Sequence, residues 1–263
     1  SRRVTAGIVV LHQGDTTNSA FYRNDWKLNR MSEMESSDMK NSGTFAPYVD
    51  FIKTPAIQVL LLGTGFLLVM LFVYMGVLTS FDNGVFESLS TLGNVEGWRG
   101  DVLRDATALG SNTVLVFVVA SVAGALGMAG EKKKALTFVI AVAAGIAMTF
   151  LLKAGIDRPR PSLTMQHVDV YTQSFPSAHA TLSTLVYFYV ANLLTQLSQS
   201  TKVRVWIYVA TAFLVFCIGL SRVLLGVHWP SDIIAGWFAG GSMAAFCFYV
   251  IKWKRKLRIK SEA

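Results

Sequence analysis

The stretch ALTFVIAVAAGIAMTFLL, residues 135–152, contains no charged side chain. About 20 apolar residues cross a hydrocarbon core of roughly 30 Å as a helix. Continuous apolar runs of this length favour helices, because lipid leaves the backbone no hydrogen-bond partner outside its own segment. We therefore predict an all-α membrane protein. Its core is expected to be a bundle of six transmembrane helices at residues 56–78, 113–130, 135–152, 180–197, 205–220 and 233–251.

Composition supports a membrane protein. Hydrophobic residues make up 52% of the 263 positions and charged residues 15%, with a mean hydropathy of +0.46. A soluble domain carries about 25% charged residues. The formal net charge is +8, but the cations lie at the ends of apolar segments, so we expect a lipid bilayer and no nucleic acid as partner. Cys217 and Cys247 lie within apolar runs and are interpreted as small buried hydrophobes.

The chain divides into three parts by composition. Residues 1–50 are polar and lack periodicity, which predicts a disordered or loosely attached cytoplasmic tail. Residues 51–252 form the expected six-helix domain, and residues 253–263 a basic cytoplasmic tail. Within the domain, residues 80–112 are too polar to span but carry apolar residues at helical spacing, which predicts short interfacial helices. We interpret them as a cap packed on the bundle, with a substrate gate as the alternative.

Orientation follows from lysine and arginine, which are enriched in cytoplasmic connections. One side of the predicted bundle collects Lys53, Lys132, Lys133, Lys134, Lys202, Arg204, Lys252, Lys254, Arg255, Lys256, Arg258 and Lys260. The other side has Arg99, Arg104, Lys153, Arg158, Arg160 and Arg222. We therefore expect both termini in the cytoplasm. A bacterial inner (plasma) membrane is the expected location.

Three polar stretches interrupt the apolar chain at residues 153–161 (KAGIDRPRP), 176–179 (PSAH) and 221–232 (SRVLLGVHWPSD), all on the predicted outer face. Their cations suit a phosphate group, because a phosphomonoester carries up to two negative charges and arginine offers a planar fork of donors. Lys153, Arg160 and Arg222 are the candidate binders, although any one alone could be an interface anchor. Arg158, between Asp157 and Pro159, fits an ion pair or a lipid-headgroup contact equally well.

The PSAH stretch opens the fourth predicted span. A proline suits the first turn of a helix, and the backbone N–H groups of Ser177 and Ala178 would then point to an anion at the positive end of the helix dipole. Beside such an anion, His179 is a candidate general acid. The alternative is a structural histidine in a capped first turn.

The last polar stretch opens the sixth predicted span. Trp229 precedes a proline and should be extended, so the helix is expected to start at Pro230. Asp232, in the first turn, can then reach back to a ring nitrogen of His228. A carboxylate at one imidazole nitrogen strengthens the other as a nucleophile. A helix-capping aspartate beside an incidental histidine is the alternative.

Taken together, Lys153, Arg160-Pro161, the PSAH stretch and Ser221-Arg222 with His228 and Asp232 resemble the three-part signature of the type-2 phosphatidic acid phosphatase superfamily. The resemblance covers residues 56–251 and implies that Lys153, Arg160, Ser177 and Arg222 bind phosphate. It further implies that His228 forms a phosphohistidine, that His179 protonates the leaving alcohol, that Asp232 orients His228, and that no metal or other cofactor takes part. Ala178 stands where the family usually has glycine, and its N–H remains available.

The expected activity is hydrolysis of a lipid phosphate monoester or lipid pyrophosphate, such as phosphatidic acid, phosphatidylglycerol phosphate or polyprenyl pyrophosphate. Residues 162–175 either help to select the headgroup, through His167, Asp169 and Tyr171, or form a plain connection. A lipid phosphotransferase would use the same residues. Vanadium haloperoxidases share the signature but are usually soluble, and a non-catalytic six-span protein is the structural alternative.

Overall fold

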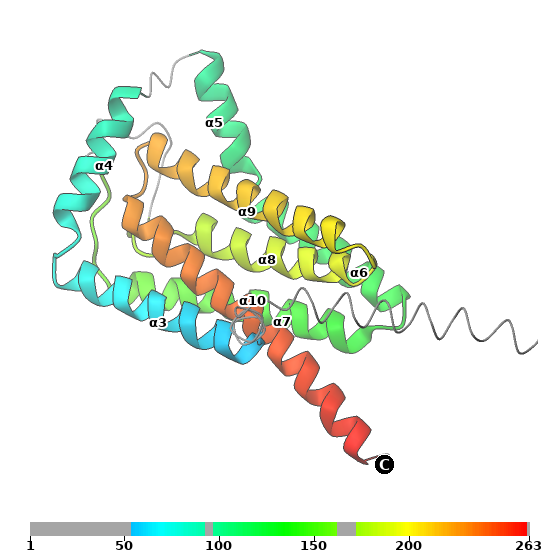
Figure 1. Cartoon of the computed structure of the whole chain (residues 1–263). Helices are drawn as coiled ribbons and strands as arrows, with labels where there is room; N and C mark the ends of the chain where they lie inside the picture. Colours follow the sequence, from blue (N-terminus) through cyan, green and yellow to red (C-terminus); the bar gives the residue numbers. More distant parts are fainter. Residues whose placement is uncertain (1–53, 93–96, 162–171, 262–263) are drawn as a thin grey trace, which may run out of the picture. The chain divides into compact units, whose positions relative to one another are not determined.

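The computed structural model describes residues 54–92, 97–161 and 172–261, and every regular element in this part of the chain is a helix (Figure 1). The predicted tail at residues 1–50 lies outside the described residues. The helices are α3 (Pro55–Tyr74), α4 (Thr79–Leu92), α5 (Trp98–Ala108), α6 (Asn112–Met128), α7 (Lys132–Gly155), α8 (Ala178–Thr195), α9 (Thr201–Leu224) and α10 (Pro230–Ser261). The all-α prediction is confirmed.

Four of these helices are long and apolar enough to cross a membrane: α3, α7, α9 and the Pro230–Ile251 part of α10. The helices α5 and α6, bent by 42° at their junction, pass the same test only when taken together. The described residues therefore hold four spans, or five with the bent pair, which makes the chain a multi-pass membrane protein. The predicted count of six is not reached by this measure, because α8 is not among these helices.

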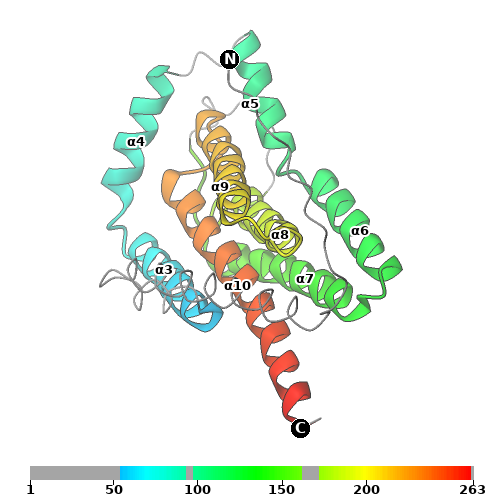
Figure 2. The same ribbon diagram turned by 45° about the vertical axis from the view of Figure 1, so that its right-hand side comes forward.

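The helix α8 lies in the middle of the bundle and contacts α6, α7, α9 and α10 (Figure 2). Its residues Leu182, Leu185, Val186 and Tyr189 form a buried cluster with side chains of α6, α7 and α10. The ring of Tyr189 stacks on Phe138 of α7, with 4.2 Å between the centroids. Protein rather than lipid surrounds α8, so it can carry the buried hydroxyl residues Thr181, Ser183 and Thr184, which explains its lower apolar content.

Glycines let α10 approach α8 closely. A Cβ atom at Gly236 would lie 2.7 Å from Cβ of Ala180, and one at Gly240 would lie 2.2 Å from the carbonyl oxygen of Thr181. Small residues four positions apart allow two membrane helices to pack backbone to backbone. This contact fixes the relative position of the two helix N-termini that carry His179 and Asp232.

The predicted short helices between the first two spans are present as α4 and α5. The helix α4 packs against α9 and α10, and α5 packs against α9, in keeping with a cap on the bundle. Among its described side chains α4 buries only Asp82 and Phe86, while Phe81 is exposed. The inner face of α4 is therefore narrow and contains a buried carboxylate.

Four helix ends carry the polar stretches. Lys153 lies in the last turn of α7, Ser177 caps the N-terminus of α8, Arg222 lies in the last turn of α9, and Asp232 lies in the first turn of α10. Contacts between these ends, described below, bring the three stretches together as the sequence predicts.

Candidate active site

His228 lies in the connection between α9 and α10 and is 2% exposed. Its Nδ1 atom lies 3.5 Å from Oδ2 of Asp232, and its Nε2 atom lies 3.2 Å from Nη1 of Arg160. A guanidinium only donates hydrogen bonds, so Nε2 must hold the lone pair and Nδ1 the proton. The ring is therefore held in the tautomer that leaves Nε2 as the electron-pair donor.

Burial lowers the pKa of His228 to about 3, and the neighbouring Asp232 opposes this shift without overcoming it. The imidazole is consequently neutral at neutral pH. A neutral ring with its lone pair on Nε2 is the form required of a nucleophile.

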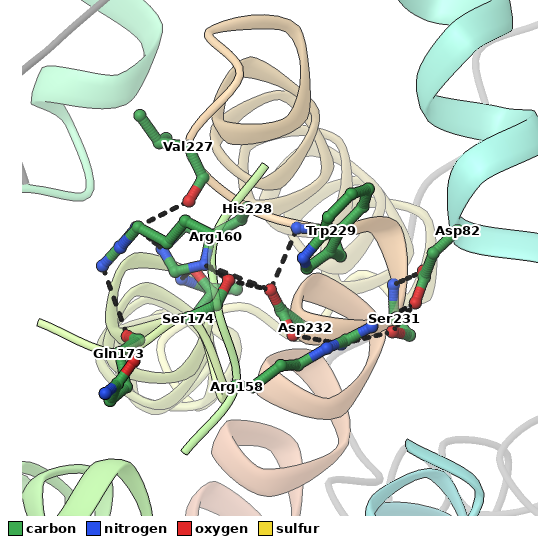
Figure 3. Close-up of polar contacts among 12 residues, drawn as sticks. Asp82, Arg158, Arg160, Gln173, Ser174, Val227, His228, Trp229, Ser231 and Asp232 are labelled. Carbon is green, nitrogen blue, oxygen red and sulfur yellow. Dashed lines mark hydrogen bonds and ion pairs between the residues drawn. The ribbon is translucent and has the colours of Figure 1, made fainter. Parts of the chain in front are cut away.

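Asp232 is fully buried and accepts three further hydrogen bonds (Figure 3). Oδ2 accepts from Oγ of Ser174 at 2.5 Å and from the Trp229 amide at 2.9 Å, while Oδ1 accepts from Nη1 of Arg158 at 2.5 Å. The bond from the Trp229 amide caps α10, which begins at Pro230 as predicted. Asp232 thus caps its helix and also contacts His228, so the two interpretations of this residue are compatible.

Lys153 and Arg160 lie on the same side of the site and share an acceptor. Nζ of Lys153 donates to the carbonyl of Gln173 at 2.5 Å, and Nη2 of Arg160 donates to the same carbonyl at 3.3 Å. Arg160 also donates to the carbonyls of Thr172 at 2.7 Å and Val227 at 2.6 Å. These main-chain contacts hold both cations near His228.

Arg222 is 6% exposed and donates from Nη1 to Oγ1 of Thr107 in α5 at 3.1 Å. Its Nε atom is buried and has no hydrogen-bond partner among the described residues. Its charge acts on the rings of His179 and His228 and on Lys153. A buried arginine with an unused donor in such surroundings is suited to an anionic ligand.

The helix α8 begins later in the chain than predicted, because Pro176 was expected in its first turn. The helix begins at Ala178, and Ser177 is the N-cap whose Oγ accepts from the Ala180 amide at 3.5 Å. Pro176 therefore precedes the cap instead of occupying the first turn. The Ser177 amide is not available either, because it donates to the carbonyl of Asp232 at 3.2 Å.

This bond shifts the candidate anion seat by one residue. The amides of Ala178 and His179 have no hydrogen-bond partner within the described residues. They are the first two N–H groups of α8, where the helix dipole favours negative charge. The side chain of His179 lies beside the junction of α5 and α6, where a Cβ atom at Gly110 would be 3.4 Å from its Cδ2 atom.

The sequence did not reveal three polar residues of this site: Asp82, Ser174 and Ser231. The Arg158 guanidinium lies between Asp82 and Asp232 and also donates to Oγ of Ser231 (Figure 3). Of the two alternatives for Arg158, the structure shows the ion pair. The available signal for Asp82 was an acidic residue on the apolar side of a short predicted helix.

The residues 162–171, with the candidate headgroup-selecting side chains His167, Asp169 and Tyr171, lie outside the described residues. Within the described ranges, no three His, Cys, Asp or Glu side chains are grouped so as to hold a metal ion.

The arrangement defines a class of protein: a multi-pass helical membrane protein whose buried neutral histidine is flanked by a carboxylate and a cluster of cations. Residues 134–256 match the PAP2 superfamily. The chain is 31% identical over 132 residues to decaprenylphosphoryl-5-phosphoribose phosphatase of Mycobacterium tuberculosis, covering 49% of this chain and 68% of that protein. It is 25% identical over 157 residues to phosphatidylglycerophosphatase B of Bacillus subtilis, covering 59% and 74% of the two chains.

The fold is shared with a solved structure as well. The crystal structure of the first transmembrane PAP2 type phosphatidylglycerolphosphate phosphatase from Bacillus subtilis superposes with a TM-score of 0.67 at 22% identity, covering 76% of this chain and 96% of that chain. The chain belongs to the PAP2 superfamily; the members named above are phosphatases of lipid phosphates, and the solved one is a transmembrane protein. The resemblance inferred from the sequence motifs is confirmed.

Proposed function

We propose that this protein is an integral-membrane phosphatase that hydrolyses lipid phosphate monoesters or lipid pyrophosphates through a phosphohistidine on His228. The observation that carries the proposal is the pairing of His228, with Nε2 3.2 Å from the Arg160 guanidinium and Nδ1 facing Asp232. A nucleophile whose lone pair points to a fixed cation would meet the phosphate that the cation binds.

In the first half of the reaction, Nε2 of His228 attacks phosphorus in line and the bond from phosphorus to the leaving oxygen breaks. His179, as the imidazolium, gives one proton to that oxygen and is left neutral. The positive charge that develops on His228 is stabilised by Asp232, which accepts at Nδ1. The products of this half are the lipid alcohol, or the lipid monophosphate from a pyrophosphate, and phosphohistidine.

In the second half, His179 accepts a proton from water as the water oxygen attacks the phosphohistidine. The bond between phosphorus and Nε2 breaks, releasing inorganic phosphate and the neutral His228 ring. The roles of His179 in the two halves are opposite, as microscopic reversibility requires.

Charge neutralisation in this proposal comes from the protein. Lys153, Arg160 and Arg222 hold the equatorial oxygens together with the first amides of α8, now those of Ala178 and His179. Ser177 contributes as the cap that fixes these amides. Preorganised donors of this kind stabilise charge as it develops. The proposed reaction is accordingly independent of metal and of other cofactors.

The proposed topology has six spans, with α8 as the sixth, buried among the other helices. Both termini lie in the cytoplasm and the active site opens on the outer, periplasmic side of an inner membrane. The distribution of lysine and arginine supports this orientation. The domain is proposed to cover residues 51–252, flanked by the polar tail 1–50 and a basic tail 253–263, through which α10 continues to Ser261.

The substrate class is proposed from the chemistry and from the relatives. Phosphatidic acid, phosphatidylglycerol phosphate and a polyprenyl pyrophosphate are the candidates. The relatives include a phosphatidylglycerophosphatase, a decaprenylphosphoryl-5-phosphoribose phosphatase and, at 36% identity over 67 residues, an undecaprenyl-diphosphatase of Sulfolobus acidocaldarius. That last match covers 28% of the relative, so it carries less weight.

The test is release of inorganic phosphate by the detergent-purified protein from these lipids, with EDTA present. Release by the parent and by His12→Ala, with none from His228→Ala, is the expected result. His12→Ala serves as the matched control because it removes a histidine from the polar tail. A folded parent that releases no phosphate would refute the hydrolase, and appearance of a phosphorylated second lipid would identify a phosphotransferase instead.

A further inference from the structure

Asp82, in the first turn of α4, is a buried carboxylate that the proposed mechanism does not use. It is 1% exposed. Its Oδ1 atom accepts from the Ser231 amide at 2.9 Å, and its Oδ2 atom accepts from Oγ of Ser231 at 2.6 Å and from Nη2 of Arg158 at 2.5 Å. Both oxygens are therefore used: both contact Ser231 in the first turn of α10, and Oδ2 also contacts the Arg158 guanidinium.

Arg158 connects this carboxylate to the one that faces the nucleophile. Its Nη2 atom binds Asp82, and its Nη1 atom donates to Oδ1 of Asp232 at 2.5 Å (Figure 3). The two oxygens of Asp232 thus have different partners: Oδ1 accepts from Arg158, and Oδ2 faces His228. The chain of contacts runs from Asp82 through Arg158 and Asp232 to His228.

A second contact joins the same two segments. The ring of Phe86, one helical turn after Asp82, packs on the ring of Trp229 with 5.4 Å between centroids. The indole nitrogen of Trp229 donates to the carbonyl of Pro159 at 2.9 Å, and the Arg158 guanidinium lies 5.9 Å from the ring. The inner face of α4 therefore contacts Trp229, which is next to His228, and Ser231, which is next to Asp232.

We propose that Asp82 and Arg158 are positioning residues that hold the plane of the Asp232 carboxylate so that Oδ2 faces Nδ1 of His228; this inference rests on the proposed function. A carboxylate bound at one oxygen only can rotate about its Cβ–Cγ bond. The bond from Arg158 to Oδ1 prevents that rotation, and Asp82 fixes Arg158. In a buried site such charge-assisted bonds are short and strong.

Asp82 lies outside residues 134–256, the part that matches the PAP2 superfamily. The helix α4 would thus supply a component of the nucleophile's support from outside the matched region. The competing account is a structural staple, in which the Asp82–Arg158 pair only fastens α4 to the bundle.

The test compares Asp82→Asn and Arg158→Gln with the same changes in an exposed pair. Asp101 and Arg104 form that control, since they are 2.7 Å apart with side chains 69% and 47% exposed. The measurements are the amplitude and the rate constant of acid-quenched phosphoenzyme formation from radiolabelled phosphatidic acid in detergent, and the inhibition constant of inorganic phosphate. These separate the number of competent sites, the speed of attack and phosphate binding.

We expect the rate constant to fall about 10- to 100-fold in Asp82→Asn and Arg158→Gln, the usual cost of removing an orienting partner. Amplitude and the phosphate inhibition constant should stay within about twofold of the parent. The double variant should be no slower than Arg158→Gln alone, because Asp82 acts through Arg158. Asp101→Asn and Arg104→Gln should behave as the parent.

Several outcomes would overturn the inference. A lowered amplitude with an unchanged rate constant would identify a structural staple, and an Asp82→Asn rate equal to that of Asp101→Asn would remove any role. If Asp82→Asn does not fold, Ser231→Ala takes its place, since it removes two contacts of the network but keeps the amide bond; a parental rate there would refute positioning. A parent that forms no phosphoenzyme would overturn the proposed function and this inference together, whereas an active parent isolates the inference.

Discussion

Oγ of Ser174 lies between His228 and Asp232, donating to Oδ2 of Asp232 at 2.5 Å and lying 3.4 Å from Nδ1 of His228. The hydroxyl has one proton, which the carboxylate takes, so its lone pairs face the ring N–H. The His228 proton is consequently shared between Ser174 and Asp232. The nucleophile has two acceptors at Nδ1.

Ser174→Ala should lower kcat about tenfold with little change in KM, because the ring N–H keeps only the carboxylate 3.5 Å away. Steady-state phosphate release checks this. Ser183→Ala is the matched control, a buried serine of α8 that donates only to the carbonyl of Ala180. Equal kcat values for the two variants would contradict a role for Ser174.

Acidification should weaken the fold through His228. Burial lowers its pKa to about 3, so between that pH and about 6.5 the unfolded chain binds a proton that the folded chain does not. The free energy of unfolding is therefore intact above about pH 6.5 and falls as the pH decreases, by about 1.4 kcal/mol per unit.

The thermal midpoint in detergent, measured at about pH 7 and about pH 5, checks this expectation. The parent should lose more on acidification than His228→Asn, which has no titrating ring at this position. Parallel losses in the two proteins would show that His228 does not titrate with an altered pKa.

Gly240→Ala should separate α8 from α10, because its Cβ would lie 2.2 Å from the carbonyl oxygen of Thr181, a backbone atom that cannot move alone. We expect a loss of about 1–3 kcal/mol or more in the free energy of unfolding, the range for overpacked sites. Gly124→Ala in α6 is the control, since nothing lies within 4 Å of its Cβ position. Thermal midpoints should fall for Gly240→Ala and hold or rise for Gly124→Ala; equal midpoints would contradict the close approach.

Arg222→Lys should weaken phosphate binding although it keeps the charge. The buried Nε donor and the planar fork are lost, and a lysine cannot reproduce either. We expect the inhibition constant of inorganic phosphate to rise about tenfold. Arg104→Lys, at an exposed arginine, should leave it unchanged; an unchanged constant in both variants would exclude Arg222 from the anion site.

Much of this could be predicted from the sequence because the informative signals were local. Uncharged runs marked the helices, and the third predicted span, residues 135–152, lies within α7. His228 and Asp232 are four residues apart, so their contact follows from a helix that begins at Pro230. The exception is the start of α8, where a hydrogen bond from Ser177 to a different helix shifted the free amides by one residue.

The missed residues depend on contacts between distant segments. Asp82 and Ser231 are 149 positions apart, and Asp82 and Arg158 are 76 apart. Periodicity in residues 80–112 predicts a short amphipathic helix and can place Asp82 on its apolar side, but it does not show which distant residues that side contacts. Ser174 was hidden for the same reason, in a connecting loop whose path is set by tertiary packing.

The carbonyls of Thr172, Gln173 and Val227 already accept hydrogen bonds from Lys153 and Arg160. A phosphate that binds the Arg160 guanidinium must therefore replace neutral oxygens with charged ones, and the binding free energy gained is the difference between the two kinds of hydrogen bond. A dianion gains more from this exchange than a monoanion, whereas a neutral headgroup gains little. Selection by ligand charge would then depend in part on main-chain carbonyls, which compete with the ligand for the same donors.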